Sequence, residues 1–304
     1  MQLSIVENLR GVIPPVATPL TEERKVDEPG LRRLVRHVLD GGACALFVMG
    51  STGEFSAFTR EVRRSIIEMV IDEVAGRVPI LAGVSDSGSE LAALNAKDAE
   101  AAGADAVVLT MPYYFPASTD QDALDHFRCV AGSTGLPLIM YNVPRAVKSA
   151  IGVDSVVQLA EEGTVVAIKD SSTDFTHFQQ LILSLSHLPH FRIFQGSEFQ
   201  MGASVLMGAH GGVLGISNVA PRLCVQLYEA ASSGNIDLTR ELQRKVTAVS
   251  QVFWAGESTL GGLKAAISML GICGPTPTMP IQPVSAEPRK KIRKILEDCG
   301  LIPG

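Results

Sequence analysis

Short β-rich runs alternate with amphipathic helical runs along most of this chain, at a spacing of roughly 25 to 30 residues. That spacing is typical of a strand–helix unit in a parallel sheet. The expected strands are 11–17, 45–49, 79–83, 106–110, 137–141, 165–168, 191–195 and 211–216. Eight such units with right-handed crossovers close a (β/α)8, or TIM, barrel, which we predict here. An open doubly wound sheet is the structural alternative.

Amphipathic segments fill the intervals between these strands. The expected helices are 28–39, 60–75, 89–102, 120–131, 153–161, 175–185, 201–207 and one that begins after Pro221. From Asn235 the pattern is helical only, over about 237–254, 259–270 and 287–298. No linker rich in Gly, Ser and Pro separates this tail. We therefore expect a barrel with the catalytic site in 1–234, and a C-terminal helical region packed on it in 235–304.

Composition narrows the function classes. With 304 residues, 46% hydrophobic and 19% charged, and a formal net charge of -6, the chain can form one large domain and lacks the basic surface that nucleic acid needs. We see neither a signal peptide nor an apolar run of roughly 18 residues, so we expect a cytoplasmic protein without membrane contact. The five cysteines are widely spaced without a CxxC pair, which indicates reduced thiols.

The sixth expected strand ends abruptly on charged residues. Val165–Ile168 has the composition of a buried strand, and Lys169 and Asp170 follow it. A polar residue at the carboxyl end of a barrel strand lies at the rim where active sites assemble. Burial disfavours a charged amine, and a neutral amine can attack a carbonyl carbon to form a Schiff base. The other interpretation is a lysine that begins a surface loop.

The remaining strand ends carry tyrosines, small hydroxyl residues and glycines. They are Thr18, Gly50–Glu54, Tyr113, Tyr114, Tyr141, Gly196–Glu198 and Gly215–Asn218. We take Gly196, Glu198 and Gly215 as candidate substrate-binding residues. No His, Asp and Glu cluster has the spacing of metal ligands, so we expect neither a metal nor another cofactor.

An imine-forming lysine needs a group that moves protons, and the phenol of Tyr141 can both donate and accept. A 2-keto acid also needs donors for its carboxylate. Ser51 and Thr52 can supply them, together with the loop amides near Gly50 and Gly53, because glycines let the backbone approach an anion closely.

Each of these residues has a structural interpretation as well. Tyr141 could be a core tyrosine whose hydroxyl is satisfied by a neighbour. Gly50–Gly53 could be a tight strand-to-helix turn, with Glu54 an ordinary first-turn acid favoured by the helix dipole. Tyr113 and Tyr114 lie between two prolines and could form a rigid exposed turn.

Four motifs together resemble one family. They are GSTGE at Gly50–Glu54, PYY at Pro112–Tyr114, YNVP at Tyr141–Pro144 and the lysine in AIKDSS. Their order and spacing are similar to those of the dihydrodipicolinate synthase and N-acetylneuraminate lyase family, over the chain from Gly11 to about Leu270. The resemblance implies a homotetrameric, metal-free class I enzyme that binds pyruvate or a related 2-keto acid as a Schiff base and uses an aldehyde as its second partner.

The resemblance also implies roles for individual residues. Lys169 would form the imine and Tyr141 would be the general acid and base. Ser51 would relay protons between Tyr141 and Tyr114, with Tyr114 supplied by the neighbouring subunit. Ser51 and Thr52 would also bind the pyruvate carboxylate.

Departures from the family pattern leave the second substrate open. Ala146 stands where synthases of the lysine pathway usually have an arginine for aspartate semialdehyde. Arg145 lies one residue earlier, and we take it as a candidate substrate-binding residue. Of the positions by which sialic acid lyases bind sugar hydroxyls, this chain has Glu198 near one, Phe199 in place of a second acid and Gly215 in place of a serine.

We therefore consider three candidate functions. One is a pyruvate Schiff-base lyase or synthase of the dihydrodipicolinate synthase type. The second is an aldolase or dehydratase for a hydroxylated 2-keto acid, and the third a non-catalytic 2-keto acid binder on the same fold.

Overall fold

A closed ring of parallel strands forms the centre of the protein. The structure is a computed structural model that describes residues 2–304, and side chains from Ile5 onward. The sheet order is β1-β8-β7-β6-β5-β4-β3-β2. The strands are β1 (Gly11–Val12), β2 (Leu46–Val48), β3 (Ile80–Gly83), β4 (Ala106–Thr110), β5 (Leu138–Asn142), β6 (Ala167–Asp170), β7 (Arg192–Gln195) and β8 (Gly211–Gly212).

The segment after β1 closes the ring against β2. Phe47 N donates to Pro14 O at 2.9 Å, and Val16 N donates to Phe47 O at 2.8 Å. The predicted (β/α)8 barrel is therefore confirmed, and the open sheet is excluded. β1 is shorter than the predicted 11–17 because Pro14 and Pro15 have no N–H with which to extend a ladder.

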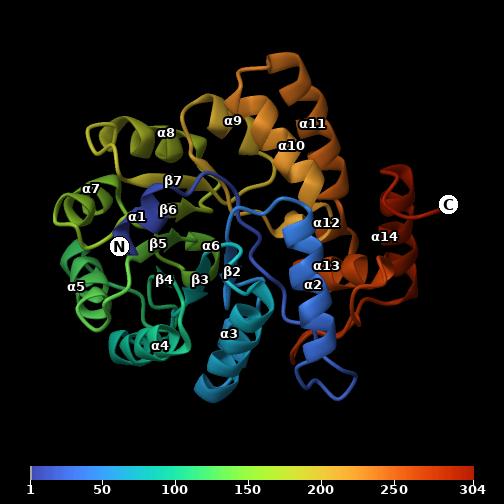
Figure 1. The fold of residues 1–304 in the computed structure, drawn as a ribbon, viewed down its shortest axis with the longest axis horizontal. Coiled ribbons are helices and arrows are strands. Elements are labelled where there is room, and N and C mark those ends of the chain that lie inside the picture. The colour runs from blue at the N-terminus through green and yellow to red at the C-terminus, as the bar shows by residue number, and fades with distance from the viewer. Residues whose placement is uncertain (1) are drawn as a thin grey trace.

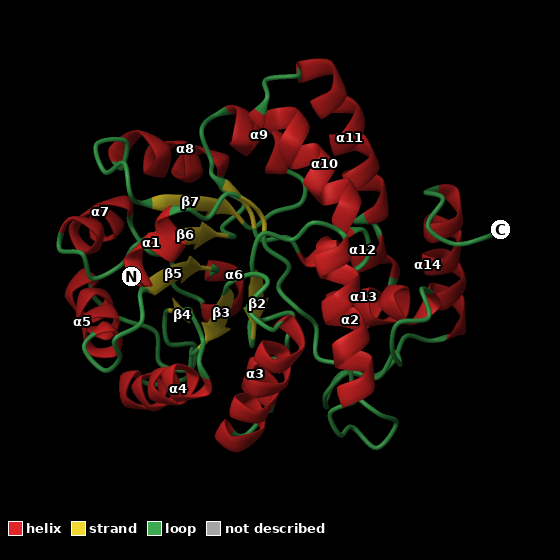
Figure 2. Ribbon diagram, viewed as in Figure 1, coloured by secondary structure: helices red, strands yellow, loops and turns green. Residues whose placement is uncertain are grey.

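Helices surround the strands, as Figure 2 shows in red around yellow. They are α1 (Gln2–Glu7), α2 (Glu28–Asp40), α3 (Arg60–Val74), α4 (Ser89–Ala102), α5 (Asp120–Ala131), α6 (Pro144–Val147), α7 (Val153–Glu161), α8 (Phe175–Ser184), α9 (Met201–Leu206) and α10 (Pro221–Ser232). Short 3-10 helices are η1 (Phe55–Ala57) and η2 (Gly215–Asn218). The expected strand 211–216 is thus only Gly211–Gly212, and its second part turns into η2.

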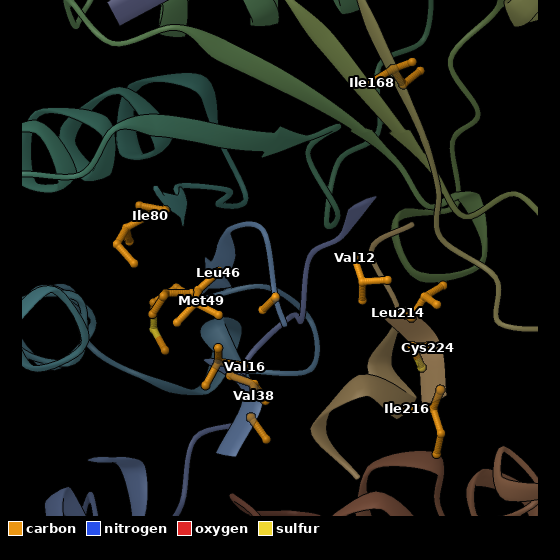
Figure 3. Packing of buried hydrophobic residues seen from close by; sticks show 14 of the residues in the cluster. Val12, Val16, Val38, Leu46, Met49, Ile80, Ile168, Leu214, Ile216 and Cys224 are labelled. Carbon is orange, nitrogen blue, oxygen red and sulfur yellow. The ribbon is translucent and has the colours of Figure 1, made fainter. Parts of the chain in front are cut away.

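Two apolar cores hold the barrel together. The inner core lies inside the ring of strands and includes Phe47, Tyr141 and Phe194, with Val6 and Leu9 from the N-terminal segment packed against it. The outer core fills the space between the strands and their covering helices, and Figure 3 shows part of it. Successive side chains of each strand therefore point alternately into the inner and the outer core. Because Tyr141 belongs to the inner core, a residue that pairs with it on a neighbouring strand also points into the barrel.

The C-terminal region is helical, as predicted. It contains α11 (Ile236–Val249), α12 (Val252–Ala255), α13 (Thr259–Met269) and α14 (Ala286–Asp298), so the predicted helix 237–254 is two helices. Figure 1 places α12 and α13 on the side toward which the arrowheads of β5 and β6 point. The domain boundary after residue 234 stays a prediction. Within residues 2–304, no helix has both the length and the apolar character for a bilayer crossing.

Candidate active site

Lys169 points into the barrel from β6. The strand covers 167–170 and not the predicted 165–168, so Lys169 lies inside a hydrogen-bonded strand in register with Tyr141 on β5. Its side chain is only 6% exposed. The Nζ atom lies 3.9 Å from the centre of the Tyr141 ring and 5.1 Å from that of Phe47. The interpretation as a surface-loop lysine is therefore wrong, and the amine is held between aromatic rings.

Tyr141 faces this amine from the neighbouring strand, with its ring edge-on to Phe47 at 6.1 Å. Burial acts to raise the pKa of its phenol, but the charge of Lys169 and hydrogen bonds with Ser51 and Ser171 outweigh burial and lower that pKa below its ordinary value. The phenolate is thus more accessible near neutral pH, which suits a group that accepts and returns protons.

The loop after β2 is packed too tightly for side chains at its glycines. A Cβ on Gly50 would lie 2.6 Å from a ring carbon of Phe47, and one on Gly53 would lie 3.1 Å from Val16 O. Thr18 Oγ1 also donates to Gly53 O at 2.8 Å. These contacts hold the loop in a position where the Ser51 hydroxyl interacts with the phenol of Tyr141.

Glu54 ends this loop in a buried ion pair. Its backbone is left-handed, with φ of 59°, and its carboxylate pairs with Lys264 of α13 while both side chains are almost fully buried. The other carboxylate oxygen accepts from Thr278 N at 2.6 Å and Thr278 Oγ1 at 2.7 Å. Lys264 Nζ donates in addition to Thr276 O at 2.9 Å. The interpretation of Glu54 as an ordinary first-turn acid is therefore wrong.

A cavity of about 550 Å³ is lined by Lys169, Tyr141 and Ser51 together. Its lining contains eight of the predicted site residues, which are Ser51, Thr52, Tyr141, Arg145, Lys169, Gly196, Glu198 and Gly215. Gly50 and Gly53 support the loop without lining the cavity. Tyr114 does not line it either: its side chain is 74% exposed and packs edge-on against Phe115.

Glu198 is buried beside the cavity. Its Oε1 accepts from Ile216 N at 3.2 Å. Burial raises the pKa of the Glu198 carboxyl above its ordinary value, although backbone hydrogen bonds and the charge of Lys169 oppose that shift. A Cβ on Gly215 would lie 3.3 Å from Glu198 Oε1, so the absence of a side chain there leaves room for the carboxyl.

Arg145 and its neighbour Ala146 line the cavity from the short helix α6. The Arg145 side chain is exposed, and no carboxylate among the described residues pairs with it. Thr173 also lines the cavity, in a left-handed conformation with φ of 63°. Such a conformation is strained for a β-branched residue, and Gln200 Nε2 supports it through a 2.9 Å bond to Thr173 O.

Asp170 holds the end of β6 in place. Its carboxylate accepts from Asn142 Nδ2 and from Ser172 Oγ, both at 2.6 Å. Because consecutive strand residues face opposite ways, Asp170 fixes the outer side while Lys169 is held on the inner side. No three His, Cys, Asp or Glu side chains are grouped as metal ligands in the part of the chain that the structure describes.

Sequence reasoning missed the contribution of the C-terminal helices to the cavity. They supply Phe253, Trp254, Thr259, Leu260 and Leu263. Nothing in the local pattern of these residues marked them as cavity-lining. Lys264 did leave a signal, because it is a single charge within the apolar helical run LGGLKAAISML.

A barrel that holds a buried strand-end lysine against a tyrosine defines a class of metal-independent lyases, and comparison with known proteins agrees. The chain belongs to the dihydrodipicolinate synthetase family, whose model matches residues 8–299. The resemblance in the sequence motifs is thereby confirmed.

Relatives extend over nearly the whole chain. A 4-hydroxy-tetrahydrodipicolinate synthase of Gluconacetobacter diazotrophicus is 31% identical over 96% of this chain and 98% of its own length. An uncharacterized DapA-like lyase of Halobacterium salinarum is 31% identical over 97% and 95%. The family and its lyase chemistry are therefore clear. One of these two relatives is named for a particular reaction, and the other is named only as a lyase.

Solved structures match equally well. Dihydrodipicolinate synthase from Bacteroides thetaiotaomicron superposes with a TM-score of 0.91 at 37% identity, covering 96% of this chain and 99% of that one. YagE, a prophage protein of the family from E. coli K12, was solved in complex with pyruvate and superposes with a TM-score of 0.93 at 27% identity, covering 97% and 100%.

Proposed function

We propose that this protein is a class I lyase or synthase that binds pyruvate, or a related 2-keto acid, as a Schiff base on Lys169. It then joins the bound donor to an aldehyde, or performs the reverse cleavage. The observation that carries the proposal is the position of Lys169 Nζ, buried at the cavity floor 3.9 Å from the Tyr141 ring. The pyruvate complex of YagE supports the choice of donor.

Imine formation uses groups that already lie together. The neutral amine of Lys169 attacks the keto carbon of pyruvate, and the carbonyl electron pair moves to oxygen and takes a proton from the Tyr141 phenol. Loss of water then gives the iminium ion. The hydroxyls of Ser51 and Thr52 would bind the pyruvate carboxylate, since both residues line the cavity beside Lys169.

Carbon–carbon bond formation follows through the enamine. The Tyr141 phenolate left by the first step removes a proton from the methyl carbon of the iminium ion, and the enamine carbon then attacks the aldehyde carbonyl. The alkoxide formed takes this proton back from Tyr141. Water hydrolyses the iminium ion to release product and free Lys169, and the proton set free returns to the Tyr141 phenolate. A proton relay through Ser51 is supported by its interaction with the Tyr141 phenol, which lowers the pKa of that phenol. No metal or other cofactor enters these steps.

Subunit assembly belongs to the same proposal. Tyr114 is too exposed to serve the cavity of its own chain, and together with Phe115 it presents two aromatic rings at the surface. We propose that Tyr114 completes the site of a neighbouring copy, in a homotetramer built as a dimer of dimers that works in the cytoplasm.

The mass of the intact protein after incubation with pyruvate and borohydride tests the donor. We expect wild type to gain one reduced pyruvate and Lys169→Ala to gain none. Lys148→Ala is a matched control, because Lys148 is an exposed lysine near the mouth and should leave the adduct intact. A wild-type protein without an adduct would sink the proposal.

Enamine formation separates catalysis from mere binding. Wild type should exchange the methyl protons of pyruvate for deuterium in D2O, and Tyr141→Phe should exchange them about 100-fold more slowly or worse. An adduct without exchange would instead identify a non-catalytic 2-keto acid binder.

A further inference from the structure

The cavity lining combines polar and apolar side chains. Lys169, Tyr141, Ser51 and Thr52 are among the polar ones. Five large apolar side chains, here called the apolar wall, also line the cavity, and they are Phe199, Phe253, Trp254, Leu260 and Leu263. Four of these five come from the C-terminal helices, so the fold adds an apolar surface to the cavity of the Schiff-base lysine.

Two aromatic rings form the outer part of that wall. Phe199 and Trp254 lie with ring centres 6.4 Å apart and planes at 29°, so the two side chains are stacked. They remain 37% and 56% exposed although both line the cavity. Trp254 is also the only tryptophan of the chain. Exposed aromatic surface inside a cavity is a binding feature, because water contact is unfavourable for it and a planar ligand would remove that contact.

The five apolar side chains of this wall offer one polar group, the indole N–H of Trp254. A chain of sugar hydroxyls would need several donors and acceptors. Beyond the residues assigned to pyruvate, the polar side chains of the lining are Arg145, Ser171, Thr173, Ser197, Glu198 and Thr259. Glu198 already receives Ile216 N on one carboxylate oxygen. An unpaired hydroxyl placed against apolar rings loses its hydrogen bonds to water, so this wall disfavours polyhydroxylated acceptors.

The cavity also has the space for a ring. A cavity of about 150 Å³ is enough to hold benzene in a protein interior. The volume here is about 550 Å³, which leaves room for pyruvate on Lys169 and a planar aromatic group beyond it. Gly215 contributes to this space, since a Cβ there would lie 3.3 Å from the Phe253 ring.

We propose that the second substrate is an aryl aldehyde, whose ring stacks on the Phe199–Trp254 pair. This inference rests on the Schiff-base function proposed above. The enamine carbon forms a bond to the aldehyde carbon, the carbonyl π electrons become an alkoxide that takes the Tyr141 proton, and water releases a 4-aryl-4-hydroxy-2-keto acid. The reverse reaction cleaves the same bond to return pyruvate and the aryl aldehyde.

Aldehyde preference is the direct test. Pyruvate consumption is measured with benzaldehyde, aspartate semialdehyde, D-glyceraldehyde and acetaldehyde, alongside the borohydride adduct. We expect kcat/KM for benzaldehyde to exceed that for D-glyceraldehyde and aspartate semialdehyde by at least about tenfold. Better turnover of either of those two would overturn the aryl assignment.

Variants at the aromatic wall give the second arm. Trp254→Ala should lower kcat/KM for benzaldehyde by about tenfold through KM, with a much smaller loss for acetaldehyde, and Trp254→Phe should restore most of the loss. Leu183→Ala removes another exposed apolar side chain, which lies outside the cavity, and controls for surface effects. Equal losses for both aldehydes would refute stacking on Trp254.

The two proposals fail in different ways. If wild type forms the pyruvate adduct on Lys169 and shows no aryl preference, only the acceptor assignment is wrong. If no adduct forms, the Schiff-base function is refuted and the acceptor inference with it.

Discussion

Replacement of Lys264 by methionine tests whether the C-terminal region holds the substrate loop. Methionine is close to lysine in length, so packing is largely kept and the positive charge is lost. The Glu54 carboxylate would then remain buried with only Thr278 as its hydrogen-bond donor. Glu54 follows directly on the loop that carries Ser51 and Thr52, so both stability and catalysis should respond.

Breaking a buried ion pair by removing one partner costs about 3 to 5 kcal/mol, because the remaining charge is uncompensated. Here both side chains are at most 2% exposed. Thr278 keeps two hydrogen bonds to the carboxylate, which favours the lower end, about 3 kcal/mol. That is a large part of the roughly 5 to 15 kcal/mol by which folded proteins are stable.

Urea denaturation measures this loss through the transition midpoint, provided that the slope m is unchanged. Lys245→Met is the matched control, because it removes an exposed lysine that pairs with Glu241 on the surface of α11. Surface pairs of this kind contribute about 1 kcal/mol or less. The same samples should show a higher KM for pyruvate in Lys264→Met. If Lys264→Met is no less stable than Lys245→Met, the reasoning about the buried pair is wrong.

Two pH-dependent predictions follow from the shifted groups. Ser51→Ala removes a hydrogen bond that lowers the pKa of Tyr141. Because the free enzyme needs the Tyr141 phenol protonated, the descending limb of kcat/KM against pH should move to higher pH; an unmoved limb would show that Tyr141 is not the titrating acid. Burial raises the pKa of the Glu198 carboxyl in the folded protein, so the folded protein keeps this proton at pH values where the unfolded chain has lost it. The free energy of unfolding of wild type therefore falls as pH rises above about 4.3, the pKa of glutamate in an unfolded chain. Glutamine does not titrate, so Glu198→Gln escapes this loss. The urea midpoint of Glu198→Gln minus that of wild type should therefore be larger at pH 8 than at pH 5; an equal difference at both pH values would contradict a raised pKa.

Local periodicity is why the barrel could be predicted. A strand or helix leaves its pattern in neighbouring residues, so α4 and α7 have the predicted ends, and β4 matches in full. The strands that fall furthest short of their predicted lengths are β1 and β8. After β1, Pro14 and Pro15 interrupt the ladder, and after β8 the chain enters η2 instead of extending the strand.

Strand ends explain why much of the candidate site could be predicted as well. The carboxyl ends of parallel barrel strands meet at one mouth. Lys169 and Tyr141 were therefore expected together from topology alone, and they occupy paired positions on β6 and β5. Ser51 was expected beside them on the same ground.

Sequence by itself determined the barrel, the strand-end lysine and the tyrosine beside it, because these depend on short-range pattern and on a topology that admits few solutions. Tertiary structure decided the rest. Only packing shows that Glu54 meets Lys264 in the interior, since a charged residue in a sequence normally indicates the surface. Only packing brings Trp254 against Phe199 in one cavity, because contacts between distant segments depend on the shape of the whole core and leave no period along the chain.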